Sequence, residues 1–359
     1  MQTLFAFQQT RLSNRELAWQ DFKQSLIPEN GASASEGELL KKAIEQVVKG
    51  HQENELQEIP EELKDRLVEI GNACRQQDLK DLKYLRHNML KEVEGVMQLF
   101  FWVLGLSLAL ADYEDQRFGQ RKLNSGSRTT FYFTGNRALT LLQKRVKGLS
   151  LPSWSTFGDR LSQWYKELTQ HAELSRISEG QTGLDGDIKF LRFWYKSILW
   201  KSESFQDFFE EHDMGWAENQ PIIKSMISKT LKSISEEGVE LAPLSYQWED
   251  DKQFFEDIFD YTLELESWAE NLVSSHAKNW DTDRIAQVDM VLLKMALTEM
   301  IKFPSIPVKV TINEYIELSK RYSTPKSKKF INGILDVLAN ELAADGTIKK
   351  SGRGLIDNK

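Results

Sequence analysis

The sequence predicts an all-α fold, and three observations lead to that prediction. Only eight prolines occur in 359 residues, and the strong helix formers Leu, Glu and Lys are abundant. In several stretches apolar residues recur at three- and four-residue steps, which is the period of one helix face. Runs rich in Gly, Ser or Asp separate these stretches and predict loops. With 40% hydrophobic residues, the chain can bury a sizeable core in one to three domains.

The N-terminal part contains helical stretches and loops. Periodicity rich in Lys and Glu predicts helices over residues 37–50 and 60–90, and residues 124–126 and 179–186 are predicted loops. The longest apolar run is LFFWVLGLSLALA, residues 99–111. At about 1.5 Å rise per residue this run falls short of the roughly 30 Å core of a bilayer. We therefore expect a buried helix, no membrane span, and a cytoplasmic protein, since no signal peptide opens the chain.

The C-terminal third predicts four further helices. The first has one apolar face, formed by Phe255, Ile258, Thr262, Leu265, Trp268 and Leu272. The second is expected to begin at Asp283, whose carboxylate can accept the unpaired amide hydrogens of an N-terminus, and to run to Lys302. Because this helix is apolar over most of its circumference, we expect it at the centre of the bundle.

Prolines mark the boundaries of the last two helices. Pro304 and Pro307 end the central helix, and Pro307 suits a first helical turn, where a missing N–H costs nothing. The next helix has a face of Val308, Ile312, Tyr315, Ile316 and Ser319. Thr324 and Pro325 are expected to be the N-cap and first residue of the last helix, whose core stripe is Ile331, Ile334, Leu335, Leu338 and Leu342. Gly333 within it costs about 1 kcal/mol against alanine, which the close approach of a neighbouring helix would explain.

Little in the sequence points to catalysis. None of the five histidines has a carboxylate three residues away, so the Glu-x-x-His pattern of di-iron bundles is absent. There is no P-loop, no glycine-rich turn after a strand, and no cysteine pair for zinc. The single cysteine, Cys74, suits a reducing compartment. We expect no enzyme, no cofactor and no metal. The net charge of -8 argues against a general nucleic-acid coat but allows a local basic site.

Residues 279–338 contain four motifs in a fixed order: W-D-x-D-R-I, I-P-V-K-V-x-I-N-E, E-L-S-K and K-F-I-N-G-I-L-D. In this order they resemble the C-terminal half of the bacterial NusB family of transcription antitermination proteins. The resemblance covers roughly a third of the chain and implies a NusB-type helical bundle. Residues 1–10 would then be the end of its first helix, 11–217 a long helical insertion, 218–345 the RNA- and partner-binding domain, and 346–359 a flexible tail.

The resemblance implies an antitermination factor for ribosomal RNA operons. Such a protein binds boxA-type RNA together with the ribosomal protein NusE and acts on elongating RNA polymerase. One alternative is a NusB-like module that has lost RNA binding and acts through protein contacts alone. Another is the RNA-binding part of an RNA methyltransferase, against which the missing glycine motif and catalytic cysteine pair count.

Phe330 is the sharpest candidate for RNA contact. It lies about 100° from the core stripe of the last helix and is flanked by Lys326 and Lys329, which suits a base-stacking platform with phosphate neighbours. The alternative is that it packs beside Val337 at the edge of the bundle. The resemblance favours RNA, because K-F-I-N-G matches a segment through which NusB proteins contact boxA. Lys320, one helix earlier, would join the same patch.

By the same resemblance, Gln2 and Phe5 align with positions near the RNA. Relatives carry an arginine-rich segment before this helix, and the chain, which starts at Met1, is expected to lack it. RNA binding would then be weakened, unless the start is placed too late.

Two carboxylates, Asp289 and Glu299, fall within the apolar stripe of the central helix. Buried carboxylates need partners, so we expect them to accept hydrogen bonds from a helix end or a basic side chain. Alternatively, Asp289 and Asp283 lie at an edge that meets NusE, where the resemblance places that partner.

A second basic region, residues 116–158, contains eight positive charges and no acidic residue. Arg121, Lys122, Lys144 and Arg145 are candidates for auxiliary RNA contact. The alternative is a solvated helix face whose charges balance acidic neighbours.

Overall fold

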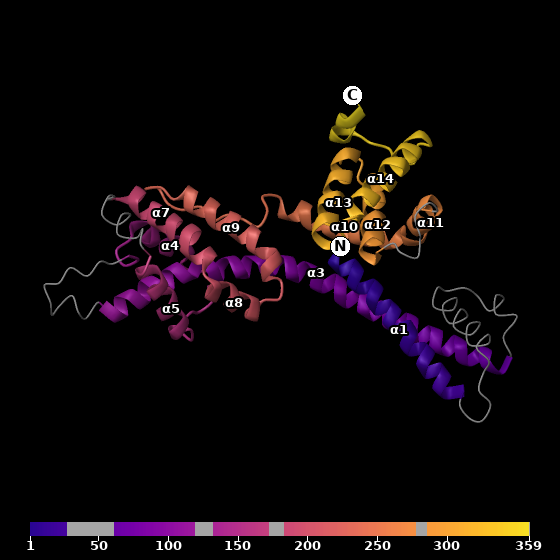
Figure 1. Cartoon of the computed structure of the whole chain (residues 1–359), viewed down its shortest axis with the longest axis horizontal. Helices are drawn as coiled ribbons and strands as arrows, with labels where there is room; N and C mark the ends of the chain where they lie inside the picture. The colour runs from indigo at the N-terminus through magenta and orange to yellow at the C-terminus, as the bar shows by residue number, and fades with distance from the viewer. Residues whose placement is uncertain (27–60, 119–131, 172–182, 278–285, 359) are drawn as a thin grey trace. The chain divides into compact units, whose positions relative to one another are not determined.

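The computed structural model describes residues 1–26, 61–118, 132–171, 183–277 and 286–358. All regular structure in these ranges is helical, apart from one isolated two-residue bridge (Figure 1). The prediction of an all-α fold is confirmed. The predicted helix over residues 37–50 and the predicted loop at 124–126 lie outside the described ranges.

The described helices vary from three residues to 58. In chain order they are α1 (Gln2–Leu26), α3 (Glu61–Phe118), α4 (Arg137–Val146), α5 (Gly158–Thr169), α7 (Leu184–Phe193), η3 (Trp194–Ile198), η4 (Leu199–Lys201), α8 (Glu203–His212), α9 (Trp216–Ser233), α10 (Trp248–Glu264), α11 (Glu266–His276), α12 (Gln287–Lys302), α13 (Val308–Tyr322), α14 (Ser327–Ala344) and η7 (Gly352–Asn358). The predicted stretches 60–90 and 99–111 form one continuous helix, α3. Of the loop predicted at 179–186, residues 179–182 lie outside the described ranges. Gly183 has φ +88° and directly precedes α7, so residues 184–186 are helical, contrary to the prediction.

The chain forms two compact units. Unit 1 combines Met1–Leu90 with Glu249–Lys359, and unit 2 is Lys91–Trp248. Helix α3 contributes its first half to unit 1 and its second half to unit 2. The unit boundaries therefore differ from the expected ones after residues 10, 217 and 345, because part of the expected insertion packs with the C-terminal helices.

Helix α12 is the centre of unit 1. It ends at Lys302 as predicted, its residues are buried on almost every side, and α1, α11, α13 and α14 all contact it. The predicted stripe of α14 is buried throughout, and α13 buries Ile312, Tyr315 and Ser319 as expected. The predicted N-cap Asp283 lies outside the described residues.

The predicted helix over residues 255–272 is in fact two helices, α10 and α11, which meet at Leu265. In α10 the burial of Ile258 and Thr262 agrees with the predicted apolar face. Beyond the break the buried positions are Ala269 and Val273, whereas Trp268 is 38% exposed. The change of direction at Leu265 rotates the second segment, so the periodicity of a single straight helix fails there.

The C-terminal segment is docked rather than a flexible tail. The Ser351 amide donates to the Pro304 carbonyl (2.9 Å), and Lys350 Nζ donates to the Phe303 carbonyl (3.1 Å). A Cβ added at Gly354 would lie 2.1 Å from the Pro304 oxygen, so this backbone approaches the α12–α13 turn closely. Glycine is required there because any side chain would separate the two segments.

Unit 2 is built on the apolar half of α3. The run 99–111 contributes Phe100, Val103, Leu104, Leu106 and Leu110 to the core with no exposed surface. Among the described helices, α3 alone has a segment long and apolar enough to cross a membrane by length and composition, and half of that segment is buried inside the protein. A core helix passes the same test, so this observation is weak evidence for a membrane span.

Glu114 on α3 holds the backbone of residues 132–134 by hydrogen bonds. Its buried carboxylate accepts the backbone N–H groups of Tyr132 (2.8 Å), Phe133 (2.9 Å) and Thr134 (2.6 Å), and the hydroxyl of Tyr165 (2.7 Å). Burial and the hydrogen bond to Glu114 raise the pKa of Tyr165, which keeps its hydroxyl a donor. These four donors satisfy a charge that would otherwise be costly to bury.

In unit 1 a buried charge cluster ties three helices together. The Glu266 carboxylate of α11 accepts two hydrogen bonds from the Arg11 guanidinium of α1 (2.7 and 2.8 Å) and one from Lys294 Nζ of α12 (3.0 Å). Only 4% of the Lys294 side chain is exposed. Burial opposes ionisation of Glu266, but the hydrogen bonds and charges of Arg11 and Lys294 outweigh it and lower its pKa from 4.5 to about 2.

Because the pKa of Glu266 is lower in the folded protein, its contribution to stability is fully present above about pH 4.5 and is lost as the pH falls toward 2. Glu266→Gln leaves Lys294 and Arg11 without their counter-charge, which typically costs about 3–5 kcal/mol for a buried pair. We expect a lower free energy of unfolding at pH 7 by chemical denaturation, and a difference from wild type that is constant above about pH 4.5 and shrinks as the pH falls from there toward 2. Glu270→Gln is the control, since that carboxylate is 55% exposed and 3.6 Å from Lys294. A difference constant with pH would contradict the assignment.

Gly333 is not held against a neighbouring helix, contrary to the expectation, since an added Cβ would meet no atom within 4 Å. Gly333→Ala should therefore raise the free energy of unfolding by about 1 kcal/mol, because alanine has the higher helix propensity. Gly354→Ala is the matched contrast and should destabilise the protein. Chemical denaturation of both variants measures the effects, and a destabilising Gly333→Ala would show that the helix is in contact after all.

Candidate nucleic-acid interface

The strongest local concentration of positive charge in unit 1 is the turn between α13 and α14. Its sequence is KRYSTPKSKK, and no Asp or Glu occurs from Leu318 to Leu335. We call its five exposed basic residues the basic corner: Lys320, Arg321, Lys326, Lys328 and Lys329. The corner is thus a local exception in a chain of net charge -8.

Hydroxyl groups order the turn. The Ser327 hydroxyl lies within hydrogen-bonding distance of the hydroxyls of Ser323 (3.0 Å) and Thr324 (2.8 Å), and the Ser327 amide donates to the Thr324 carbonyl (3.0 Å). Helix α14 begins at Ser327, two residues later than predicted, because Pro325 and Lys326 form a turn and Lys326, not Thr324, is the N-cap. The first turn of α14 has no acidic residue, so its partial positive charge adds to that of the lysines.

The members of the basic corner differ in their partners. Lys320 contacts Glu317, and the Arg321 guanidinium lies over the Tyr322 ring, 5.3 Å from its centroid. No ion pair among the described residues involves Lys326, Lys328 or Lys329. These three ammonium groups therefore have no intramolecular counter-charge there and can neutralise an anion.

Phe330 does not form an exposed platform beside these lysines. Its side chain is only 7% exposed and belongs to the same apolar core as Ile331 and Leu4. Phe330 lies off the central stripe of α14, as predicted, but the core of unit 1 also covers that edge of the helix. Phe330 therefore packs inside the bundle, as the alternative prediction had it. Its neighbours are core residues rather than Val337, which is 47% exposed.

The other residues expected near RNA on α1 have mixed environments. Gln2 is exposed, whereas Phe5 is half-buried and packs against the same core as Phe330. Both helices therefore contribute to one hydrophobic cluster.

The two carboxylates of α12 have different outcomes. Glu299 is buried and accepts hydrogen bonds from the hydroxyls of Thr311 (2.7 Å) and Tyr315 (3.2 Å), so its donors are hydroxyl groups rather than the helix end or basic side chain that was expected. Burial raises the pKa of Glu299 despite these bonds. Asp289 is also buried, but its Oδ1 has no hydrogen-bond partner among the described residues, so the expected acceptor role is not fulfilled there. Asp283, expected to join it at a partner edge, lies outside the described residues.

Comparison with known proteins places this C-terminal region in a family. A family model described as the NusB family matches residues 224–340. Proteins named transcription antitermination protein NusB are 45% identical over 105 residues in Salinibacter ruber, 51% over 85 residues in Chloroherpeton thalassium and 36% over 115 residues in Oleidesulfovibrio alaskensis. These alignments cover 29%, 24% and 32% of this chain, and 66%, 40% and 69% of the respective relatives. The chain belongs to the NusB family.

The family match does not extend to the whole molecule. The chain spans less than two thirds of the length of the first two relatives, and the family model leaves residues 1–223 unmatched. A solved structure of T. maritima NusB is 27% identical and covers 40% of this chain and 85% of that one, with a TM-score of 0.26. The basic corner lies within the NusB family match, whereas residues 91–223 of unit 2 lie outside it.

Two of the four residues predicted to make auxiliary RNA contacts lie in the described part of unit 2. Lys144 and Arg145 are exposed in the last turn of α4, with Lys147 directly after it. Arg121 and Lys122 lie outside the described residues.

Sequence reasoning missed Arg321 and Lys328 as members of the basic corner. The sequence feature that indicates them is the absence of Asp and Glu over 18 positions, Leu318–Leu335. Residues 116–158 have the same feature. For this NusB-family chain, charge counting along the segment is therefore more informative than the position of one aromatic residue.

Because Phe330 is core, Phe330→Ala should reduce the free energy of unfolding by about 3–5 kcal/mol through lost burial and the cavity left behind. Neutralising Lys328, which is exposed on the same turn of α14, should change stability by no more than about 0.5 kcal/mol. Thermal and chemical denaturation of the two variants measure this difference. If the Phe330→Ala variant were as stable as wild type, Phe330 would not be a core residue.

Proposed function

We propose that this protein is a transcription antitermination factor for ribosomal RNA operons. In this proposal it binds boxA-type RNA together with NusE in the cytoplasm and acts on elongating RNA polymerase, contributing binding and no chemical step. Membership of the NusB family, whose relatives are named transcription antitermination proteins, supports the proposal. The single observation that carries the RNA contact is the basic corner, with three lysines that lack an acidic partner among the described residues.

Lys326, Lys328 and Lys329 contact RNA phosphates in this proposal, with Lys320 and Arg321 beside them. Phosphate contacts supply affinity and orientation but carry no sequence information, so boxA bases need further contacts. Gln2 and the exposed part of Phe5 are the proposed candidates on α1. Phe330 contributes by holding the first turn of α14 in place.

The NusE-binding surface is proposed at the start of α12. Asp289 supports this assignment, since its buried Oδ1 lacks a hydrogen-bond donor among the described residues, and such a group is costly to leave unpaired. Asp283 is proposed to belong to the same surface. The purified pair should co-elute and bind boxA-type RNA more tightly than either protein alone.

The deciding experiment is a salt titration of RNA binding by fluorescence anisotropy. Lys326→Gln/Lys328→Gln/Lys329→Gln should weaken binding and reduce the slope of log K against log salt by up to about 2, at roughly 0.7 for each lost phosphate contact on a single strand. The control is Lys80→Gln/Lys83→Gln/Lys349→Gln, which removes the same charge from exposed positions elsewhere in unit 1.

Equal slopes for wild type and the basic-corner variant would contradict the RNA assignment. If NusE still bound both proteins, the result would favour the alternative in which this family member acts through protein contacts alone. Absence of both RNA and NusE binding would remove the proposed function.

A further inference from the structure

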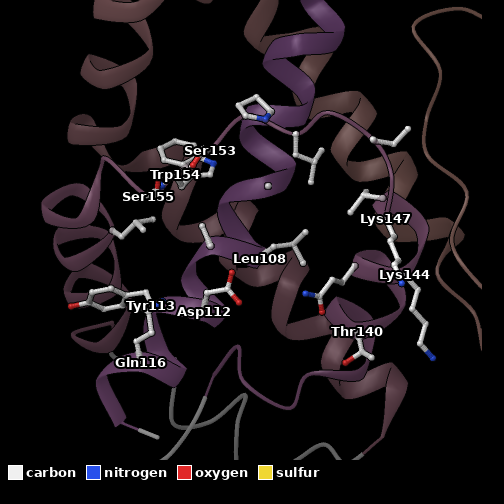
Figure 2. A pocket seen from close by; sticks show the side chains of 18 of the residues that line it. Leu108, Asp112, Tyr113, Gln116, Thr140, Lys144, Lys147, Ser153, Trp154 and Ser155 are labelled. Carbon is white, nitrogen blue, oxygen red and sulfur yellow. Dashed lines mark hydrogen bonds between the residues drawn. The ribbon is translucent and has the colours of Figure 1, made fainter.

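Unit 2 contains an open groove of about 960 Å³ between α3, α4 and the loop before α5, which we call the α3–α4 groove. One face of α3 forms its floor, with Gly105, Leu108, Ala109, Asp112, Tyr113 and Gln116 at helical spacing. Figure 2 shows Lys144 and Lys147 along one side, Ser153 and Ser155 on the other, and Leu108 with Asp112 between them. The volume is at the upper end of the roughly 300–1,000 Å³ of ligand clefts, so it suits more than a single small group.

The α4 side of the groove carries positive charge without an acidic partner. Lys144, Arg145 and Lys147 are exposed and take part in no ion pair among the described residues. Arg137 and Arg160 of the same unit, in contrast, are paired, with Glu236 at 2.7 Å and Glu211 at 3.9 Å. The expectation that these charges merely balance acidic neighbours is therefore not met within the described part of unit 2.

The groove also exposes neutral hydrogen-bonding groups. The side-chain amides of Gln116 and Gln143 make no hydrogen bond with described residues, and both line the groove. A docked apolar helix would bury these amides without partners, at a cost of about 1–3 kcal/mol each. The edges of nucleic-acid bases and the ribose hydroxyls would supply partners, while Leu108 and Ala109 offer an apolar floor for the base faces.

The walls of the groove are held rigidly. Asn136 caps α4 by accepting the Leu139 amide (3.0 Å), and Trp154 Nε1 donates to the Trp102 carbonyl of α3 (3.1 Å). Three backbone hydrogen bonds to Glu114 hold the chain that leads into α4, and a fourth, from Tyr165, holds α5. A ligand would therefore meet a largely preformed surface, which reduces the entropic cost of binding.

We propose that the α3–α4 groove binds single-stranded RNA, with Lys144 and Lys147 at phosphates and Gln116 and Gln143 at base edges. The inference rests on the proposed function and extends it, because it assigns a second RNA contact to a groove whose lining residues all lie outside the NusB family match. Binding there is weakly dependent on sequence and lengthens the RNA segment that the protein holds.

The test compares a boxA-type RNA with the same RNA extended by about ten uridines at each end, within the roughly 4–16 nucleotides that single-strand-binding folds cover. The extension should tighten binding to the wild-type full chain several-fold. Lys144→Gln/Lys147→Gln should abolish that gain and reduce the salt slope on the extended RNA by about 1.4, for two lost phosphate contacts. Binding of the short RNA should not change.

Two further variants make the result specific. Ala109→Trp fills the floor of the groove without altering charge, and should also abolish the gain. Lys189→Gln/Lys196→Gln removes two exposed charges of unit 2 outside the groove lining and should keep the gain. Circular dichroism confirms that each variant is folded. A gain that survives both groove variants, or that all three variants lose equally, overturns the proposal.

The groove and the proposed function can fail separately. If the boxA-type RNA does not bind, a uridine oligonucleotide alone is titrated, and the groove proposal then requires binding to wild type that both groove variants lose. Gln143→Cys labelled with a photoreactive maleimide identifies the occupant, since the native Cys74 is buried. Cross-linking to RNA supports the proposal, whereas cross-linking to NusE in its place overturns it and assigns the groove to a protein.

Discussion

The buried ammonium of Lys294 is the constraint on which the rest of unit 1 depends. It lies on the most buried helix of the unit, and an unpaired charge there would be strongly destabilising. Glu266 neutralises it and simultaneously binds Arg11 on α1, which is 255 positions away in the chain. The core of unit 1 is therefore complete only when α1 packs against the C-terminal helices α11 and α12.

This long-range closure explains how one chain holds a NusB-family bundle and a second compact unit. The segment between α1 and α10 leaves unit 1 through α3 and re-enters through α10. The Arg86 guanidinium on α3 donates two hydrogen bonds to Asp260 on α10 (2.8 and 3.0 Å), so the first half of α3 is attached to the bundle as well. The C-terminal bundle is thus extended by two helices that the family match does not include.

Both candidate RNA surfaces follow one electrostatic rule. The chain is acidic overall, yet the lysines of each surface lie in a stretch of sequence that contains no Asp or Glu, although Asp112 of α3 also lines the α3–α4 groove. Affinity for phosphate depends on the potential near the contact and is screened over about 10 Å in moderate salt, so the net charge does not prevent binding. The surfaces differ in what accompanies the lysines. The basic corner includes the N-terminus of α14, whereas the α3–α4 groove includes the amides of Gln116 and Gln143 and an apolar floor.

The sequence by itself determined the helical class, the positions of α12, α13 and α14 and the stripe Ile331–Leu342, because local periodicity and prolines report directly on helix faces and ends. It also located Lys326 and Lys329 at an exposed turn. Only the tertiary structure decided that Phe330 is buried, that the helix over 255–272 breaks at Leu265, and that Lys294 is paired with Glu266. Each of these depends on which distant segment covers a given face, and the period of a single helix contains no information about its neighbours. The α3–α4 groove was undetectable for the same reason, since a cavity is defined by the elements that enclose it.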